Sequence, residues 1–287
     1  MKNTGLRFFA IMMVSIFTIQ AGFAQYFETT VNSKIKAEFP WPKGKKMALS
    51  LSFDDARQSQ VKNGMPLLNR YGVKATFYVL KDSVMLQRDG WRDAVKKGHD
   101  IGNHTLKHAC SGNFEFSRAN ALEELTLAQL NKEIDQATAF LNTEIGAKPV
   151  SFAYPCGQKF VGRGKDLKSY VPLIAEKFET GRGWMDEDAN DPIYCDLAQL
   201  TGMEMDMKSF AQIKKLIDYA KLKGRWLVLA GHEINKGGSQ TTALATLEAI
   251  LKYAADPANG VWLDDVHNVA SYVNKTRMEI KKVKKAL

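Results

Sequence analysis

The sequence predicts an α/β protein, built on a parallel sheet or barrel and folded as a single domain. Three observations lead to this prediction: the composition is globular, short apolar runs alternate with longer helical patterns, and no linker interrupts the alternation. The 287 residues are 45% hydrophobic and 25% charged, which is enough to bury a full core and excludes a disordered or fibrous chain. Alternating strands and helices favour βα units, whose strands are parallel.

Eight apolar runs have the length and composition of strands, at residues 47–53, 75–80, 100–103, 150–153, 178–181, 199–203, 226–230 and 261–263. Helical patterns lie between them, at residues 61–71, 91–97, 122–145, 167–177, 210–223, 242–254 and 266–274. The longest of these has apolar residues at steps of three and four, which predicts one buried stripe.

The N-terminus is typical of a secretory signal peptide. Lys2 and Arg7 precede an apolar run at residues 8–19, and Gly22-Phe23-Ala24 offers a cleavage site. The run is shorter than the roughly 20 residues that span a bilayer, so an uncleaved anchor is the weaker alternative. We predict a signal peptide at 1–24, an N-terminal extension at 25–45, one enzymatic domain at 46–277 and a basic tail at 278–287. The mature chain is expected to be periplasmic or secreted, without a transmembrane segment.

The net charge of +9 is concentrated at the ends of the chain. Two cations lie in the leader, and residues 275–287 hold six cations against Glu279 alone. Because phosphate binding needs Lys and Arg gathered on one surface of the fold, this distribution argues against a nucleic-acid-binding protein. The basic tail is typical of a solvated terminus, with an anionic polymer or a membrane as the alternative contact.

Three cysteines are present, and at most two of them can pair within one chain: Cys110, Cys156 and Cys195. Their spacing matches no zinc–cysteine pattern. The sequence therefore predicts free thiols or one disulfide, and it does not choose the pair.

Chemistry-bearing side chains follow the first and third predicted strands. Asp54 and Asp55 end the first strand, a pattern that alone is typical of turn or helix-capping chemistry. His104 and His108 follow the third strand, and a helical turn there would project both rings to one side, about 5–6 Å apart. Two imidazoles and a carboxylate from another strand make a three-ligand site for zinc or a similar divalent ion.

Two further strand ends lie at the same predicted rim. The fourth strand runs into the tight turn Tyr154-Pro155-Cys156-Gly157, and the seventh ends before His232. An isolated histidine after a very apolar strand is, by itself, typical of a structural residue.

Taken in this order, these segments resemble the polysaccharide deacetylase family, the family 4-like carbohydrate esterases with a nodulation-type deacetylase domain. The resemblance covers residues 47–272. Its most specific parts are Ser52-Phe53-Asp54-Asp55 and the stretch from Gly98 to His108, which look like the family's first and second motifs.

The resemblance implies a distorted (β/α) barrel of about seven strands, one divalent metal ion, and hydrolysis of N- or O-acetyl groups on a polysaccharide. Zinc is the expected ion, with cobalt or nickel as alternatives. By position, Asp54 is the base that activates a metal-bound water, and His232 protonates the leaving group. The metal ligands implied are Asp55, His104 and His108, and the implied substrate-binding residues are Tyr154, Cys156 and Arg182. The backbone N–H of Cys156 falls where the third motif helps to hold the oxyanion.

The sequence departs from the family pattern at three motifs. Ala153 stands where the third motif carries an Arg that orients the base, and we hypothesise that Arg182, at the next strand end, supplies this guanidinium. The fourth motif, an Asp with a following Trp that tunes the acid, is not recognisable, and neither Asp188 nor Asp191 is given its role. The fifth motif is loose, since Ala230-Gly231 separates Leu229 from His232.

Three functions remain open at this point. The leading one is a secreted deacetylase of an acetylated polysaccharide. A related amidase acting on a non-sugar C–N bond could use the same groups. A non-catalytic glycan-binding domain is favoured by Ala153, but it would need none of the five retained Asp and His residues. The sequence leaves open the glycan, the choice between amide and ester, and the oligomeric state.

Overall fold

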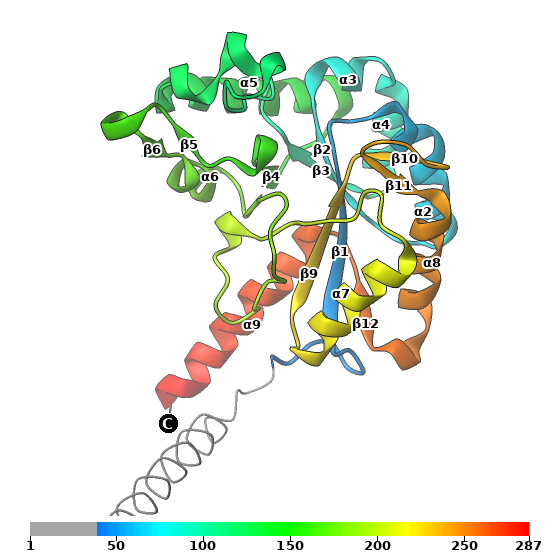
Figure 1. Cartoon of the computed structure of the whole chain (residues 1–287). Coiled ribbons are helices and arrows are strands. Elements are labelled where there is room, and N and C mark those ends of the chain that lie inside the picture. Colours follow the sequence, from blue (N-terminus) through cyan, green and yellow to red (C-terminus); the bar gives the residue numbers. More distant parts are fainter. Residues whose placement is uncertain (1–38, 287) are drawn as a thin grey trace, which may run out of the picture. The chain divides into compact units, whose positions relative to one another are not determined.

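The computed structural model describes residues 39–286, and the predicted signal peptide lies outside them. The centre is a parallel sheet in the order β7-β4-β3-β2-β1-β9-β8, with β12 paired to the start of β1 (Figure 1). This arrangement confirms the predicted α/β fold, a distorted (β/α) barrel of about seven strands. The strands are β1 (Met47–Asp54), β2 (Thr76–Val79), β3 (Asp100–Asn103), β4 (Ser151–Ala153), β7 (Thr180–Arg182), β8 (Met203–Glu204), β9 (Trp226–Gly231) and β12 (Val261–Leu263).

Each of the eight runs predicted as strands overlaps one strand of this sheet. The largest difference concerns β8, which was expected to begin at residue 199. The side chain of Asp196 accepts a hydrogen bond from the N–H of Ala198 at 3.0 Å and starts the short 3-10 turn η6 (Leu197–Gln199) instead. Two short pairs outside the main sheet were not predicted: β5 (Phe160–Val161) with β6 (Lys168–Ser169), and β10 (Glu233–Asn235) with β11 (Thr241–Ala243).

The helices lie between the strands as predicted, with differences at their ends. They are the π-helical turn η1 (Gln60–Gly64), α2 (Met65–Arg70), α3 (Lys81–Met85), α4 (Arg88–Lys96), α5 (Leu127–Ile145), α6 (Val171–Lys177), α7 (Phe210–Leu222), α8 (Leu244–Ala255) and α9 (Val266–Ala286). Short 3-10 turns occupy η2 (Glu115–Asn120), η3 (Leu122–Glu124), η4 (Pro155–Gly157), η5 (Gly164–Asp166) and η7 (Pro257–Asn259). The sequence did not predict α3, and it ended the last helix twelve residues before Ala286.

The start of α5 shows why the predicted boundary at residue 122 was too early. Thr126 and Gln129 form a capping box, in which each side chain bonds to the backbone of the other residue. Such a box satisfies the free N–H groups of a first turn, so the helix begins after Thr126. Four residues of its predicted stripe are buried, Leu130, Ile134, Ala137 and Leu141, and the fifth, Leu127, is half-buried.

The two faces of β1 have different neighbours. Met47, Leu49, Leu51 and Phe53 belong to the main hydrophobic core, together with side chains of α2, α4, α7 and α8. Because side chains alternate across a strand, the residues between them face the other side of the sheet. There Ser50 accepts a hydrogen bond from the Trp226 indole at 3.0 Å, and Ser52 donates to the carbonyl of Leu229 at 2.9 Å. The same alternation places Asp54 on the face of Ser50 and Ser52, at the carboxyl end of β1.

A second core cluster includes residues that precede the first strand. Phe39 and Trp41 are buried with Trp226 and with α9, and the Trp41 ring stacks on Tyr272. Part of the segment predicted as an extension, residues 25–45, therefore packs into this core. Among residues 39–286, no helix combines the length and apolar character needed to cross a bilayer.

Candidate active site

A cavity of about 640 Å³ opens at the carboxyl ends of the strands. In a parallel sheet these ends meet at one edge, so loops that are far apart in the sequence converge there. Six of the eight predicted site residues line this cavity. Its lining comprises Asp54, Asp55, Arg57, Leu80, Ser83, His104, His108, Phe114, Phe116, Cys156, Trp184, Met185, His232 and Gln240.

The three predicted metal ligands form a compact set. Asp55 Oδ1 lies 3.6 Å from His104 Nε2 and 3.5 Å from His108 Nε2. Two ligand atoms on a tetrahedral zinc ion, at bond lengths of about 2.0–2.1 Å, are separated by about 3.4 Å. Within the described chain, Asp55 Oδ1 and His104 Nε2 are buried and have no hydrogen-bond partner. Since buried polar atoms are nearly always satisfied, these two atoms fit ligands of a cation.

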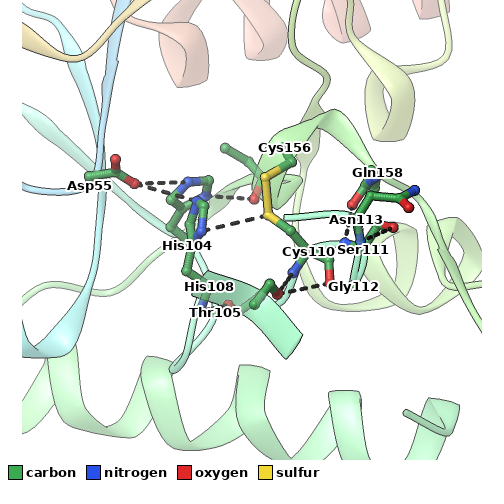
Figure 2. Close-up of a disulfide and its surroundings, with 12 residues drawn as sticks. Asp55, His104, Thr105, His108, Cys110, Ser111, Gly112, Asn113, Cys156 and Gln158 are labelled. Atoms are coloured by element: carbon green, nitrogen blue, oxygen red, sulfur yellow. Dashed lines mark hydrogen bonds and ion pairs between the residues drawn. A yellow bond between two sulfur atoms is a disulfide. The ribbon is translucent and has the colours of Figure 1, made fainter. Parts of the chain in front are cut away.

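Each histidine of the set is oriented through its other ring nitrogen (Figure 2). His104 Nδ1 lies 2.9 Å from the carbonyl oxygen of Ala153, so Nε2 turns toward Asp55. Such a carbonyl partner is a common way to orient a metal-ligating imidazole. His108 Nδ1 instead lies 3.7 Å from Cys110 Sγ.

The predicted spacing of the two rings was conditional on a helical turn at residues 104–108, and that turn is not formed. This segment is an irregular loop, in which Asn103 Oδ1 accepts from the N–H of Thr105 at 2.8 Å. The hydroxyl of Thr105 in turn accepts from the N–H of His108 at 3.0 Å. Such side-chain hydrogen bonds to the backbone compete with helix formation, which explains the loop. The two rings are nevertheless adjacent, with centroids 4.8 Å apart.

The electrostatics of the set suit a bound cation. Burial alone would raise the pKa of Asp55, but His104, His108 and His232 outweigh it and hold that pKa below its ordinary value. Burial, together with the neighbouring His104, lowers the pKa of His108 to about 4. At neutral pH the set therefore offers a carboxylate and a neutral imidazole, which are the forms that bind metal ions.

The backbone of the cavity is strained at residues that carry the site. Asp55, His108 and Cys156 have φ values of 71°, 53° and 53°. The left-handed region costs a residue with a side chain about 1–2 kcal/mol. Strain of this kind persists where the surrounding structure imposes it, and it is concentrated at functional sites.

Cys110 and Cys156 form a disulfide, and Cys195 is free. The bond joins the loop after β3 to the turn after β4, two segments 46 residues apart in the sequence. It ties the histidine loop to the turn that contains the backbone N–H of Cys156. The structure thus identifies the one pair that the sequence left open.

Asp54 and Arg182 form an ion pair beside the three predicted metal ligands. Arg182 Nη2 donates to Asp54 Oδ1, and Nη1 donates to the carbonyl of Gly183 at 2.7 Å. The guanidinium also lies 4.9 Å from the ring centre of Tyr78. Arg182 is fully buried, so it is placed to orient Asp54, as the hypothesis on Ala153 expected, and not to touch a substrate. Its assignment as a substrate-binding residue is corrected on that ground.

His232 has two partners that the sequence did not predict. Its Nδ1 lies 2.8 Å from Asp206 Oδ2, and the Trp184 ring meets it edge-on at 4.8 Å. Burial alone would lower the pKa of His232, but the Asp206 hydrogen bond and the carboxylates of Asp54 and Asp55 raise it above its ordinary value. A histidine held in this way is suited to donating a proton.

One signal could have identified Asp206: it is a carboxylate just past a predicted strand end. Asp206 and Trp184 follow different strands, β8 and β7, and both contact His232. Asp188, which was given no role, binds Arg225.

Of the two predicted substrate-binding residues in the turn after β4, only Cys156 lines the cavity. The Tyr154 side chain is buried with Phe152 and Tyr170, and its hydroxyl donates to the carbonyl of Ala198 at 2.7 Å. It points away from the cavity, so the substrate contact predicted for it is not available from this side chain. Cys156 does line the cavity.

The rim of the cavity carries aromatic residues and a cation. Phe114 and Phe116 are 43% and 69% exposed, and Phe116 lies 6.2 Å from the His108 ring. Arg57 Nη2 lies 2.9 Å from Asp55 Oδ2. Exposed rings at a rim are suited to packing against apolar faces of a ligand.

Comparison with known proteins gives a consistent picture. The model of the polysaccharide deacetylase family matches residues 42–169. A gellan lyase from a Bacillus species is 31% identical over 117 residues, which are 41% of this chain and 4% of the relative. A peptidoglycan-N-acetylglucosamine deacetylase, PgdA, from Listeria monocytogenes is 38% identical over 61 residues, which are 21% of this chain and 13% of the relative. The chain thus spans a small part of these two relatives.

The fold has solved counterparts over nearly the whole described chain. A putative polysaccharide deacetylase from Mycobacterium smegmatis superimposes with a TM-score of 0.61 at 17% sequence identity. The match covers 84% of this chain and 94% of that one. At this identity the likeness concerns the fold.

Proposed function

We propose that the chain is a member of the polysaccharide deacetylase family, whose model matches residues 42–169, and that it is a metal-dependent hydrolase that removes N- or O-acetyl groups from a polysaccharide. One observation carries the proposal. A base paired with arginine and an acid paired with aspartate line one cavity together with a carboxylate–imidazole set for a cation.

The proposed metal ligands are Asp55, His104 and His108. Two neutral imidazoles and one carboxylate are a donor set of the kind that binds catalytic zinc, and cobalt or nickel accept the same atoms. A divalent ion bound there would polarise the acetyl carbonyl and make a water molecule more acidic.

Asp54 is the proposed general base. Arg182 occupies one carboxylate oxygen, which leaves the other to take the proton of the attacking water. Gln60 supports this geometry, because its amide donates to the carbonyls of both Asp54 and His232, at 2.6 and 2.9 Å. One side chain therefore links the backbone at the proposed base to the backbone at the proposed acid.

His232 is the proposed general acid. Asp206 accepts the hydrogen bond of Nδ1, so Nε2 is the nitrogen that can give a proton to the departing amine or alkoxide. The backbone N–H of Cys156 is the proposed donor to the developing oxyanion. The positive φ of Cys156 supports this role because the turn departs from ordinary extended backbone at that residue.

We also propose that the enzyme works outside the cytoplasm, with residues 1–24 as a cleaved signal peptide and 46–277 as the catalytic domain. The Cys110–Cys156 disulfide supports an oxidising compartment. Mass spectrometry of the protein recovered from its host should give a chain beginning at Gln25. An intact N-terminus would contradict this part of the proposal.

The test of the activity is acetate release by the purified protein loaded with zinc or cobalt. The substrates are chitin oligomers, peptidoglycan, poly-N-acetylglucosamine and acetylated xylan. Peptidoglycan is included because the similar Listeria protein is a peptidoglycan-N-acetylglucosamine deacetylase. We expect release from at least one polymer. In the Asp54→Asn variant it should fall by about 10² to 10⁴-fold, the usual contribution of a general base, while metal binding is retained.

The outcomes separate the three functions. No acetate from any polymer, with one tightly bound metal ion, would favour the glycan-binding domain or the non-sugar amidase. Release that is unchanged in the Asp54→Asn variant would contradict the assigned base.

A further inference from the structure

His108 lies between two sets of metal-ligating atoms. Its Nε2 faces Asp55, and its Nδ1 faces Cys110 (Figure 2). Within residues 39–286, two groups of three side chains bring their ligand atoms within 4.8 Å of one another. One is the proposed site, and the other consists of His108, Cys110 and Cys156. The second group is tied up as a disulfide, and the proposed function makes no use of its sulfur atoms.

One pair of atoms in the second group, Cys110 Sγ and His108 Nδ1, already has the spacing of zinc ligands, whereas the two sulfur atoms must separate from their disulfide bond before both can bind. Zinc–sulfur and zinc–nitrogen bonds of about 2.3 and 2.0–2.1 Å, at a tetrahedral angle, separate sulfur and nitrogen by about 3.6 Å. Cys110 Sγ lies 3.7 Å from His108 Nδ1. The segment at residues 108–110 therefore does not have to move far for the Cys110 thiolate and this imidazole to share one ion.

The two groups exclude each other because they share one ring. A neutral imidazole carries a hydrogen on one nitrogen and offers a lone pair on the other. When Nε2 binds an ion with Asp55 and His104, Nδ1 keeps its hydrogen, and the reverse holds when Nδ1 binds. The disulfide removes the competition, since disulfide sulfur lacks the thiolate charge that binds soft metal ions.

We propose that reduction of the Cys110–Cys156 disulfide creates a second, thiolate-rich metal site at His108, Cys110 and Cys156, which competes with the Asp55–His104–His108 site for the shared histidine. The inference rests on the proposed function only in its use of His108 as a ligand of the first site. The ligand is a soft or borderline divalent cation such as zinc, cobalt or cadmium.

The redox step needs a dithiol reductant, and the cavity gives it access. Cys110 is fully buried, whereas Cys156 is part-buried and lines the cavity. One thiolate of the dithiol attacks Cys156 Sγ, the S–S bond breaks, and Cys110 Sγ leaves with the electron pair and takes up a proton. The second thiol of the reagent then displaces Cys156 as a thiolate and closes the reagent's own disulfide. Two electrons have passed to the protein, and binding of the ion releases the thiol protons.

Cobalt(II) is the probe, because thiolate ligands give it a charge-transfer absorption that nitrogen and oxygen ligands do not. All samples carry Cys195→Ser, which removes the one free cysteine. The oxidised protein should bind cobalt without this absorption. After treatment with dithiothreitol and its removal under nitrogen, the absorption should appear and acetate release should be lost. Reoxidation should reverse both changes.

Three variants separate the possible explanations. With Cys110→Ser and Cys156→Ser together, the disulfide is absent but no thiolate can form, so no charge-transfer band is expected. With His104→Ala the oxidised protein should no longer bind cobalt tightly, while the reduced protein should still show the band. With His108→Ala the reduced protein should bind cobalt more weakly, which unfolded thiols acting alone would not do.

A reduced protein whose cobalt spectrum equals that of the oxidised protein would overturn the inference. So would a band that is insensitive to His108→Ala. A failure of the proposed function gives a different result from a failure of this inference. In that case the oxidised protein would bind no cobalt or release no acetate, whatever the spectrum of the reduced protein shows.

Discussion

The two ends of β3 each carry a buried histidine, and their surroundings differ. His99 precedes the strand, where Nδ1 accepts from the N–H of Ala75 and Nε2 lies beside Asn69 Oδ1, each at 3.3 Å. His104 follows the strand, and only its Nδ1 has a hydrogen-bond partner within residues 39–286. Both rings are nearly inaccessible, at 5% and 1% exposure.

The difference separates a structural histidine from a proposed metal ligand. A fully satisfied ring contributes packing and hydrogen bonds to the fold, whereas a buried nitrogen without a partner is costly unless something binds it. Both residues are buried histidines, and they flank the same strand. The nitrogen without a partner therefore lies at the end of the sheet where we propose the active site.

The largest expected difference, in metal affinity and in acetate release, is between variants of these two histidines. His104→Ala should lower metal affinity by more than about 100-fold and abolish acetate release, because even the groups that merely orient a ligand contribute about 10 to 100-fold. His99→Gln should keep both properties, since its amide can replace the two hydrogen bonds. Zinc titration by calorimetry checks the pair, and equal losses in the two variants would erase the distinction.

Arg182 extends the comparison to a buried charge whose partner is known. Arg182→Met leaves the Asp54 carboxylate buried without its cation, which should lower the free energy of unfolding by about 3–5 kcal/mol. Arg182→Lys keeps a charge near Asp54 and should lose less. Urea denaturation measures both variants. A methionine variant as stable as the wild type would show that the pair is not needed to bury Asp54.

Asp206 is predicted to act through His232. Since its hydrogen bond helps to raise the pKa of His232, Asp206→Asn should lower that pKa. The acid would then lose its proton at a lower pH, and the alkaline limb of the pH–rate profile should move down in pH. A variant that loses activity equally at every pH would indicate a purely structural Asp206.

The smallest effect is expected at the structural end. Burial, aided by Lys74 and Lys97, lowers the pKa of His99 to about 4, below the roughly 6.5 of an unfolded chain. Between these values the unfolded chain binds more protons, so stability is lost as the pH falls from about 6.5 toward 4. The free energy of unfolding should fall less steeply in His99→Gln than in the wild type. Identical slopes in urea denaturation would contradict the assigned cause.

Much of the candidate site was predictable because its signals are local. Asp54, Asp55, His104 and His108 directly follow predicted strands, and the period-two pattern of β1 indicates which face Asp54 occupies. Asp206 and Trp184 were not predicted, because each acts on His232 across a contact between loops. No periodicity reports such a contact.

The sequence by itself determined the approximate positions of the eight strands of the main sheet, the helices between them apart from α3, and the polar residues that follow the strands, because hydrophobic periodicity and strand-end chemistry are read over a few neighbouring residues. Only the tertiary structure decided which strand ends meet. It paired Arg182 with Asp54 across 128 residues, His232 with Asp206 across 26, and Cys110 with Cys156 rather than Cys195. The reason is physical: these partners are brought together by the lateral order of the strands, a property of the whole sheet that no local stretch of sequence encodes.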